Sequence, residues 1–572
     1  MNKLRWSYAP IPNSESVKSL ANALSIDLTL AALLVQRGIT DFDQAKAYFQ
    51  PSLDQLHDPF LMRDMDRAVE RVNRALKNQE KILVYGDYDV DGTTSVAAMF
   101  QFLRAFTDQI DYYIPDRYTE GYGLSQQGIE FAKNEGYQLI ITLDCGIKEV
   151  KNVALARDKG LDIIVCDHHT PGSELPQAFA ILNAKRTDCE YPYKELCGCG
   201  VGFKLMQALC LRNGWDPELA FAFLDLVAVS IAADIVPMTG ENRALCFMGL
   251  KRMQQGQMRP GLSALLKSNE LSQITVNTLV FTIAPRINAA GRITSGKQAV
   301  ALLLSDTIET ANLESVHINQ NNETRRELDK TITLEALAQL ESRDNAKTAK
   351  STVVYHDGWH KGVVGIVASR LTEHYYRPTI VLTKSGDHLA GSARSVHGFD
   401  VYQAIEACSE HLIQFGGHKY AAGLSLKPEK LVDFQHAFEQ AVGAAITPEQ
   451  LEPELRIDLP IELPAIDQKF VRILNRMEPF GPENPIPTFF ATELQETGWA
   501  RIVGEKHLKC RLFDPRYPDY AFDAIGFNLA HHLPHIGAGK TFAAAFTIGT
   551  NTWNGATSIQ LELKDIKPAG QV

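Results

Sequence analysis

Three aspartates that alternate along one short stretch carry the first chemical signal in this sequence. Asp87, Asp89 and Asp91 occur in the run VYGDYDVDGTTS. The apolar residues 81–85 before them predict a short buried strand, and residues 95–106 after them predict a helix. Carboxylates spaced in this way can point at one small volume, where they repel each other by several kcal/mol unless a cation neutralises them. The stretch therefore predicts a divalent-metal site, with a solvated acidic turn as the alternative.

Further acidic and imidazole groups stand where strands are expected to end. The pattern predicts strands at 110–114, 139–143 and 162–166, and helices at 126–134 and 148–159. Asp144 follows the second of these strands, and Asp167, His168 and His169 follow the third. Asp234 comes directly after a later apolar run. This alternation predicts a parallel, doubly wound sheet, and such sheets place their sites at the carboxyl edge.

The side chains expected at this edge form a ligand set that is rich in oxygen. The set is Asp87, Asp89, Asp91, Asp144, His168, His169 and Asp234. Carboxylates with one or two imidazoles suit Mn²⁺ or Mg²⁺, with Zn²⁺ as an alternative. Two ions about 3.5–4 Å apart need roughly this many carboxylates, one of which bridges. Taken singly, either histidine has an ordinary role in a loop and Asp144 has one as a helix N-cap, but the coincidence at three strand ends favours a metal centre.

A second α/β segment, at 351–424, carries a group suited to phosphate. Strands are expected at 352–355 and 378–383, with a helix at 363–374 between them. Ser392 and Arg394 lie in the run GSARS, where a guanidinium stands among small residues. A guanidinium binds phosphate oxygens through two parallel hydrogen bonds, so this run predicts a phosphate clamp.

A glycine pair in the same segment is a second candidate for phosphate binding. Gly416 and Gly417 precede His418, which places backbone N–H groups beside an imidazole. Seven of the sixteen histidines of the chain fall between 356 and 418, which favours a surface that faces phosphate. The alternative is an ordinary turn, since most glycine pairs form turns.

Two further segments complete the expected organisation. Residues 306–347 are polar, of mixed charge and helix-forming, which predicts a long connecting helix. Residues 546–553 and 556–566 around Asn554-Gly555 predict a hairpin with a type I′ turn. Aromatic and basic residues alternate in this region, as in a small β-barrel that stacks bases above a basic groove, although such aromatics more often form a core. They are Trp499, Phe513, Tyr517, Tyr520 and Trp553, with Arg501, Lys506, Lys509, Arg511 and Arg516.

Composition and charge limit the class of protein. The 572 residues are enough for about three to four domains, and 45% apolar with 22% charged residues is ordinary for a globular protein. A net charge of −11 argues against a generally basic nucleic-acid binder, but carboxylates that hold metal inflate that count. Nine scattered cysteines fit a reducing cytoplasm, and no stretch predicts a signal peptide or a membrane span. Cys197 and Cys199 are expected to be buried small residues rather than metal ligands.

Five motifs, in this order and at these spacings, resemble the DHH phosphoesterase family. They are VYGDYDVDGTTS, ITLDCGI, VCDHH, SIAADIVP and FGGHKYAAG. The resemblance runs over nearly the whole chain, including PRINAAGR and GWHKGVVGIVASRL, and is strongest toward the members that digest single-stranded DNA. It implies an α/β fold in which a doubly wound, parallel-sheet DHH domain is joined by a long helix to a smaller α/β DHHA1 domain, followed by a C-terminal OB-like β-barrel.

The resemblance also implies domain bounds and roles for single residues. The expected domains are an N-terminal helical segment at 1–50, the DHH catalytic domain at 51–305, the connecting helix at 306–348, the DHHA1 domain at 349–445 and the OB-like nucleic-acid-binding domain at 446–572. The active cleft is expected between the DHH and DHHA1 domains. The expected metal ligands are Asp87, Asp89, Asp91, Asp144, His168 and Asp234, and Asp167, His169 and His418 complete the catalytic set. The expected substrate-binding residues are Arg117, Arg286, His360, Ser392, Arg394, Gly416 and Gly417.

The function that the resemblance implies is metal-dependent hydrolysis of single-stranded DNA. Two Mn²⁺ or Mg²⁺ ions are expected as cofactors, with removal of 5′-mononucleotides in the 5′-to-3′ direction during cytoplasmic DNA repair and recombination. A single-strand-binding protein and a helicase are expected partners, and no membrane is. A short-oligonucleotide or cyclic-dinucleotide phosphodiesterase of the same superfamily is the alternative, but such substrates need no extended strand track. A non-catalytic DNA-binding scaffold would have no reason to keep every carboxylate.

Overall fold

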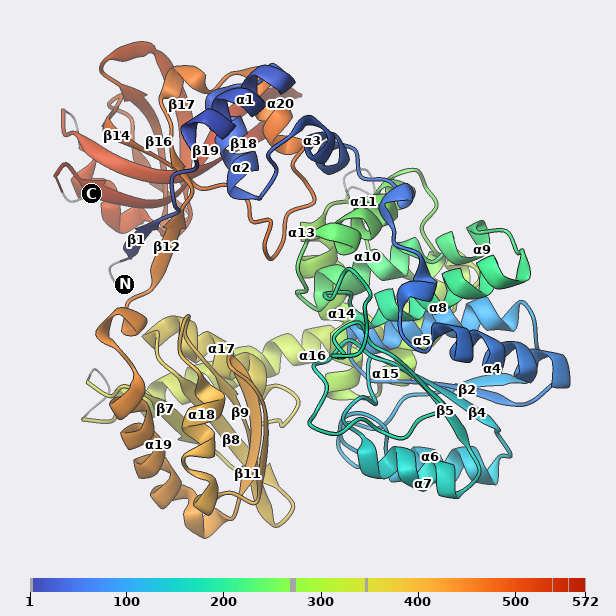
Figure 1. Ribbon diagram of the computed structural model, residues 1–572. Helices are drawn as coiled ribbons and strands as arrows, with labels where there is room; N and C mark the ends of the chain where they lie inside the picture. The colour runs from blue at the N-terminus through green and yellow to red at the C-terminus, as the bar shows by residue number, and fades with distance from the viewer. Residues whose placement is uncertain (1–3, 268–273, 345–347, 538, 554, 571–572) are drawn as a thin grey trace. The chain divides into compact units, whose positions relative to one another are not determined.

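The computed structural model describes residues 4–267, 274–344, 348–537, 539–553 and 555–570 (Figure 1). The chain forms two compact units. One contains Lys46–Arg325 and Met477–Pro485, and the other contains the residues up to Ala45, Arg326–Arg476 and the residues from Ile486 onward. Helix α16 (Ile308–Glu341) begins in the first unit and ends in the second, as the predicted connecting helix requires.

A five-stranded parallel sheet organises the unit that contains Lys46–Arg325. The strand order is β3-β2-β4-β5-β6, and the strands are β2 (Ile82–Gly86), β3 (Ile110–Tyr113), β4 (Leu139–Leu143), β5 (Asp162–Cys166) and β6 (Ala180–Leu182). Every neighbouring pair is parallel. All residues of β2 and β4 are buried, which accounts for their largely apolar sequences, with Thr142 as the one polar side chain in β4. The strand order reverses between β2 and β4, and sheets of this kind bind ligands at that point.

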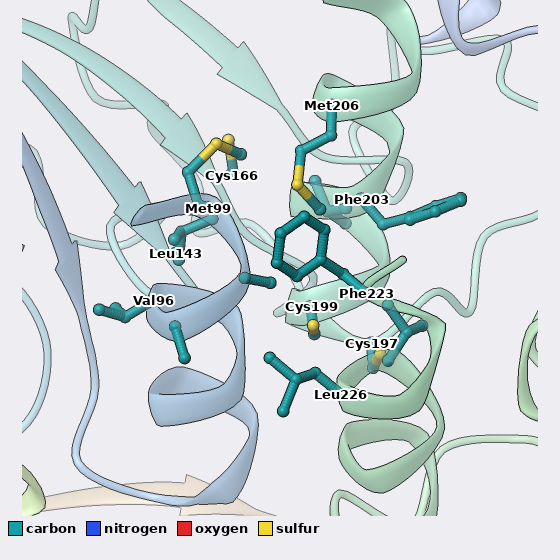
Figure 2. Packing of buried hydrophobic residues seen from close by; sticks show 14 of the residues in the cluster. Val96, Met99, Leu143, Cys166, Cys197, Cys199, Phe203, Met206, Phe223 and Leu226 are labelled. Atoms are coloured by element: carbon teal, nitrogen blue, oxygen red, sulfur yellow. The ribbon is translucent and has the colours of Figure 1, made fainter. Parts of the chain in front are cut away.

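Helices cover both faces of this sheet. On one face, Val84 and Ile141 pack against α4, α5, α8 and α10, and on the other face Leu83 and Ile140 pack against α6 and α7. Figure 2 shows part of the first core, with Met99 of α5 and Met206 of α8 among the packed side chains. The bounds are α4 (Met65–Asn78), α5 (Val90–Arg104), α6 (Gln126–Asn134), α7 (Val150–Asp158), α8 (Gly198–Asn213) and α10 (Leu224–Ala233).

The remaining helices of this unit follow the sheet in the sequence. They are α9 (Glu218–Phe221), α11 (Gly240–Gln254), α12 (Pro260–Ser263), α13 (Val276–Thr278), α14 (Ala284–Ile293) and α15 (Gly296–Leu303). One local expectation was wrong, and one element was missed. Helix α5 begins at Val90 rather than at residue 95, because Asp89 caps it, and β6 was not predicted, because three residues are too short to show a pattern.

A mixed sheet organises residues 352–426 of the other unit. Its order is β10-β11-β9-β8-β7, and only β7 and β8 are parallel. The strands are β7 (Thr352–Tyr355), β8 (Thr379–Ser385), β9 (His388–Arg394), β10 (Gln414–His418) and β11 (Ala421–Leu426), and the helices are α17 (Val364–Tyr375), α18 (Val401–Glu406) and α19 (Leu431–Ala445). The glycine pair before His418 therefore lies in an exposed edge strand, not in a turn.

A closed β-barrel forms the C-terminal part of the same unit. Its order is β14-β18-β19-β17-β16, and a pairing of β14 with β16 closes it. The strands are β14 (Phe489–Glu496), β15 (Arg501–Val503), β16 (His507–Asp514), β17 (Tyr517–Gly526), β18 (Phe542–Trp553) and β19 (Ala556–Pro568), with β13 (Leu459–Pro460) and α20 (Gln468–Asn475) before them. The hairpin of β18 and β19 is confirmed, although Asn554 of its turn lies outside the described residues. Trp553, Tyr520 and Trp499 are 74%, 45% and 37% exposed, which leaves base stacking by them as a prediction.

The N-terminal residues contain a strand where only helices were expected. Strand β1 (Arg5–Tyr8) pairs in parallel with β12 (Glu454–Ile457), ahead of α1 (Ser14–Leu24), α2 (Leu28–Gln36) and α3 (Phe42–Phe49). A pairing between such distant residues leaves no local pattern. Within the described ranges, no single helix has the length and apolar composition of a membrane span; α1 and α2, bent by 116°, pass such a test only as a pair, by length and composition alone.

A buried hydrogen bond fixes β1 to the barrel and gives the first testable prediction. The Trp6 indole donates to Asp565 Oδ2 at 2.7 Å, and His532 Nε2 lies 3.1 Å from Asp565 Oδ1. Burial alone would raise the pKa of Asp565, but these two hydrogen bonds outweigh it and lower that pKa. We expect Trp6→Phe to lower the free energy of unfolding by about 1–3 kcal/mol in urea titrations, because a buried carboxylate loses a donor.

The control for this prediction is Trp499→Phe. Trp499 is 37% exposed, so the same change there should shift the free energy of unfolding by less than about 0.5 kcal/mol. Equal shifts in the two variants would show that the hydrogen bond to Asp565 contributes nothing.

Candidate metal centre

The first three aspartates lie at the junction between β2 and α5. Asp87 follows the last residue of β2, and Asp89 is the N-cap of α5, where its carboxylate accepts the Gly92 N–H at 3.0 Å. Asp91 stands in the first turn of the helix. A Cβ atom at Gly92 would lie 2.4–2.7 Å from backbone atoms of Asp87, so only glycine lets the helix begin this close to the strand end. The glycine therefore brings the three carboxylates together.

The other ligand candidates meet around the imidazole of His168. Its Nε2 atom lies 3.1 Å from Asp144 Oδ1, 3.5 Å from Asp234 Oδ2 and 3.7 Å from Asp91 Oδ2. Asp144 directly follows β4 with a φ of 58°, a left-handed conformation that is uncommon outside glycine and that Asp adopts more readily than most residues. Asp234 is the C-cap of α10. Residues from four separate elements thus share one pocket, as the sequence predicted.

The pKa shifts in this pocket show that its carboxylates are buried close together. Burial, followed by the charge of neighbouring carboxylates, raises the pKa of Asp144, Asp234 and Asp87 well above the usual value, and raises that of Asp89. Burial also lowers the pKa of His168, which favours the neutral form of the imidazole. A neutral imidazole and several carboxylates all offer electron pairs, and a metal cation is the group that would accept them.

Several buried ligand atoms in the pocket have no hydrogen-bond partner among the described residues. They are both carboxylate oxygens of Asp87, Oδ1 of Asp144 and both ring nitrogens of His168. The N–H groups of Tyr88 and Gly123 favour the charged form of Asp87 but make no hydrogen bond of normal geometry with it. Orphaned buried acceptors are costly, and a hard divalent cation satisfies oxygen and imidazole ligands together. The residues present therefore fit Mn²⁺ or Mg²⁺.

Asp91 differs from these residues because the protein itself satisfies it. The backbone N–H groups of Gly198 and Cys199 donate to its two oxygens, each at 2.7 Å, and the Ser230 hydroxyl donates to Oδ1 at 2.6 Å. No pattern in the sequence indicates these donors, which lie more than 100 positions away from Asp91 in the chain. Cys197 and Cys199 are buried and free, as expected, but their segment also supplies backbone donors to a ligand candidate.

Asp167 and His169 form a hydrogen-bonded pair next to these residues, with His169 Nδ1 3.9 Å from Asp144 Oδ1. Asp167 Oδ1 accepts the His169 N–H at 3.0 Å and lies 2.7 Å from its Nδ1, and Asp167 Oδ2 accepts the Ile147 N–H at 2.9 Å. Burial alone would raise the pKa of Asp167, but these hydrogen bonds lower it to about 2. The Tyr122 hydroxyl, which sequence analysis missed, lies 3.3 Å from His169 Nε2 and donates to the Asp144 carbonyl at 3.2 Å.

Two predicted phosphate-binding arginines belong to the same unit as the metal pocket. The Arg117 guanidinium lies 4.6 Å from the centre of the Tyr88 ring, and its charge opposes the upward pKa shifts that burial causes at Asp87 and Asp89. Arg286 on α14 donates to Asn319 Oδ1 at 3.0 Å and to the Thr282 carbonyl at 2.6 Å. Arg117 is therefore near the pocket, whereas the contacts of Arg286 join α14 to α16.

The remaining predicted substrate residues lie in the other unit. Arg394 donates to Ser392 Oγ at 2.8 Å on β9, and a Cβ at Gly365 of α17 would lie 3.1 Å from both side chains. His360, just before α17, accepts the Gly362 N–H at 3.2 Å through Nδ1. Gly416, Gly417 and His418 lie along the exposed strand β10. Ser392 and Arg394 form a pair, as predicted, and the phosphate-binding role of all six stays a prediction.

Known families match three parts of the chain. Residues 81–231 match the N-terminal domain of the DHH family, residues 348–444 match the DHHA1 domain and residues 457–565 match the RecJ OB domain. A parallel sheet with acidic residues and a DHH motif at its carboxyl edge, followed by these two domains, defines a DHH phosphoesterase.

Curated relatives and solved structures narrow this class. The single-stranded-DNA-specific exonuclease RecJ of Bacillus subtilis is 37% identical over 99% of this chain and 71% of the relative, and that of Escherichia coli is 36% identical over 88% and 90%. The crystal structure of Thermus thermophilus RecJ in complex with Mn²⁺ matches with a TM-score of 0.84 at 27% identity, over 99% of this chain and 79% of that one. A complex of the same protein with Mg²⁺ matches with a TM-score of 0.78 at 26% identity. The chain belongs to the RecJ family.

Proposed function

We propose that this chain is a divalent-metal-dependent exonuclease that hydrolyses single-stranded DNA in the 5′-to-3′ direction and releases 5′-mononucleotides during DNA repair and recombination. The curated relatives are named single-stranded-DNA-specific exonucleases, and solved relatives carry Mn²⁺ or Mg²⁺. The observation that carries the proposal is the pocket around His168, whose Nε2 faces Asp91, Asp144 and Asp234 within 3.7 Å. Such a pocket has a use only when a cation occupies it.

The proposed roles follow from the surroundings of each residue. Asp87, Asp89, Asp91, Asp144, His168 and Asp234 hold the metal, and we assign two ions to them. When bound, Mn²⁺ or Mg²⁺ supplies Lewis acidity toward the phosphodiester and toward water. Asp167 and Tyr122 orient His169 through its two ring nitrogens, which places a titratable group beside the ligands. Arg117, close to the pocket, binds the phosphate that is cleaved.

The phosphate groups of the strand outside the pocket need further partners. We assign them to Arg286, His360, Ser392, Arg394, Gly416, Gly417 and His418. The Ser392 hydroxyl orients the Arg394 guanidinium through the 2.8 Å hydrogen bond, so that the fork is fixed before a phosphate arrives. The exposed backbone of β10 offers N–H groups of the kind that bind phosphate oxygens.

The cellular setting is part of the same proposal. Single-stranded DNA is the substrate. The proposed partners are a helicase, which produces such strands, and a single-strand-binding protein, which protects them. The nine cysteines are buried and form no disulfide, which supports action in the reducing cytoplasm.

Strands labelled at one end test this proposal. We expect 5′-labelled single strands with Mn²⁺ or Mg²⁺ to release their label at once as a mononucleotide, and 3′-labelled strands to shorten stepwise. EDTA should stop both reactions, because the carboxylates lose the cation that holds them together. Electrophoresis and chromatography of the products measure direction and product size.

A blunt duplex of the same sequence and a dinucleotide are the controls. Digestion of the duplex at the rate of the single strand would contradict strand selectivity. Faster cleavage of the dinucleotide than of the long strand would identify a short-oligonucleotide phosphodiesterase instead.

A further inference from the structure

The carboxylate of Asp91 is held by donors from two distant helices. The N–H of Gly198, the first residue of α8, donates to Oδ2 at 2.7 Å, and the next N–H, of Cys199, donates to Oδ1 at 2.7 Å. The positive end of the α8 dipole therefore faces this anion. Ser230 of α10 donates to Oδ1 at 2.6 Å, and the Ser95 hydroxyl, one turn further along α5, donates to the same oxygen at a longer distance of 3.4 Å. Asp91 is only 1% exposed, so bulk water cannot replace a lost donor.

Ser230 makes its contribution through its side chain, which a substitution can remove. The residue is completely buried, and its hydroxyl also lies 3.0 Å from the Cys197 sulfur. That sulfur caps α8 by accepting the Gly200 N–H at 3.2 Å. Figure 2 shows Cys197 and Cys199 in the packed region beside Leu226 and Phe223. The hydroxyl is thus fixed between the carboxylate and the capped end of α8.

The position of Ser230 in its helix links two ligand candidates. Asp234 comes four residues later and caps the C-terminal end of α10, so both side chains lie on one face of the helix. Ser230 contacts Asp91, and Asp234 Oδ2 lies 3.5 Å from His168 Nε2. Asp91 Oδ2 faces the same imidazole nitrogen at 3.7 Å. Helix α10 therefore positions the carboxylate of Asp234 directly, and it positions that of Asp91 through the Ser230 hydroxyl.

We propose that Ser230 is a positioning residue of the metal centre, and that it acts by fixing the carboxylate of Asp91. The inference rests on the proposed function, in which Asp91 is a metal ligand. With one oxygen fixed by the hydroxyl and both oxygens bonded to α8, the carboxylate keeps a single orientation toward His168. Hydrogen-bond partners behind a ligand commonly change metal affinity by about 10–100-fold when they are removed.

The test is the dissociation constant of Mn²⁺ for the full chain, measured by isothermal titration calorimetry. We expect Ser230→Ala to bind Mn²⁺ about 10-fold more weakly than the unaltered chain, and Ser230→Thr, which keeps the hydroxyl, to recover most of the affinity. Ser315→Ala is the matched control. Ser315 is 6% exposed on α16 and donates to the Asn312 carbonyl at 2.9 Å, so the Ser315→Ala chain should bind Mn²⁺ with unchanged affinity.

The outcomes separate this inference from the proposed function. Tight Mn²⁺ binding by the unaltered chain and equal binding by Ser230→Ala would overturn the positioning role and leave the metal centre intact. A lower melting temperature of Ser230→Ala with an unchanged dissociation constant would overturn it as well, because the hydroxyl would then only stabilise packing. Absence of Mn²⁺ binding by the unaltered chain would overturn both the metal centre and the role of Ser230.

Discussion

Asp144→Asn is expected to abolish hydrolysis of single-stranded DNA while it stabilises the metal-free protein. We expect the rate to fall by at least about 1000-fold, or ~4 kcal/mol of transition-state stabilisation. Asp144 Oδ1 lies 3.1 Å from His168 Nε2 and has no hydrogen-bond partner in the described part of the chain, so it is poised for a cation. Asparagine has the same shape and tolerates the left-handed backbone at φ 58°, so the loss would come from the charge.

The stability of the same variant should change in the opposite direction. In the absence of metal, Asp144 is repelled by Asp91, Asp89 and Asp234, after burial the largest causes of its raised pKa. Removal of one charge relieves this repulsion, which should raise the free energy of unfolding in EDTA by roughly 1–3 kcal/mol. Melting temperatures in EDTA and in Mn²⁺ measure it: the variant should melt higher than the unaltered chain in EDTA and gain less from Mn²⁺.

A surface aspartate in the same unit is the control for both effects. The Asp108 side chain is 91% exposed, and Asp108→Asn should leave both the rate and the melting temperatures unchanged. A metal-free Asp144→Asn protein that is less stable than the unaltered chain would show that Asp144 has a structural role instead. Hydrolysis by that variant at the ordinary rate would remove Asp144 from the metal centre.

The sequence predicts those parts of the site that follow from short local patterns of apolar and polar residues. Strands β4 and β5 were predicted with their observed bounds, because short segments made almost entirely of apolar and β-branched residues are typical of buried parallel strands. Once those strands are parallel neighbours, the residues that follow them must share an edge. The meeting of Asp144 with His168 was therefore predictable from the pattern alone.

The donors behind the ligands were not predictable in this way. Gly198 and Ser230 reach Asp91 across 107 and 139 positions of the chain, and a buried serine in an apolar helix has no pattern that distinguishes it from packing. The same holds for β1, whose pairing with β12 joins residues 449 positions apart, such as Arg5 and Glu454. Contacts of this kind are set by how helices and strands pack, which a one-dimensional pattern does not contain.

The structure explains why residue 92 is a glycine, which the sequence pattern alone does not. Helix propensity predicts that alanine at this position, in the first turn of α5, is better than glycine by about 1 kcal/mol. The backbone argues the opposite, since a Cβ there would lie 2.4 Å from the Asp87 carbonyl oxygen and 2.7 Å from its backbone nitrogen. A contact with backbone cannot be relieved by a side-chain rotation, so either the start of α5 or Asp87 must move.

We therefore expect Gly92→Ala to lower hydrolysis of single-stranded DNA by at least about 100-fold, because a shift of about 1 Å in a catalytic group is enough for such a loss. Gly172→Ala is the matched control in the same unit: its Cβ would meet only the Glu174 carbonyl oxygen, at 3.7 Å, and its rate should be unchanged. Circular dichroism and Mn²⁺ titration accompany the rates, so that a folded variant with weakened metal binding is distinguished from an unfolded one. A folded Gly92→Ala protein with the ordinary rate and the ordinary Mn²⁺ affinity would mean that Asp87 does not need its present position, and the metal centre would then have to be built without it.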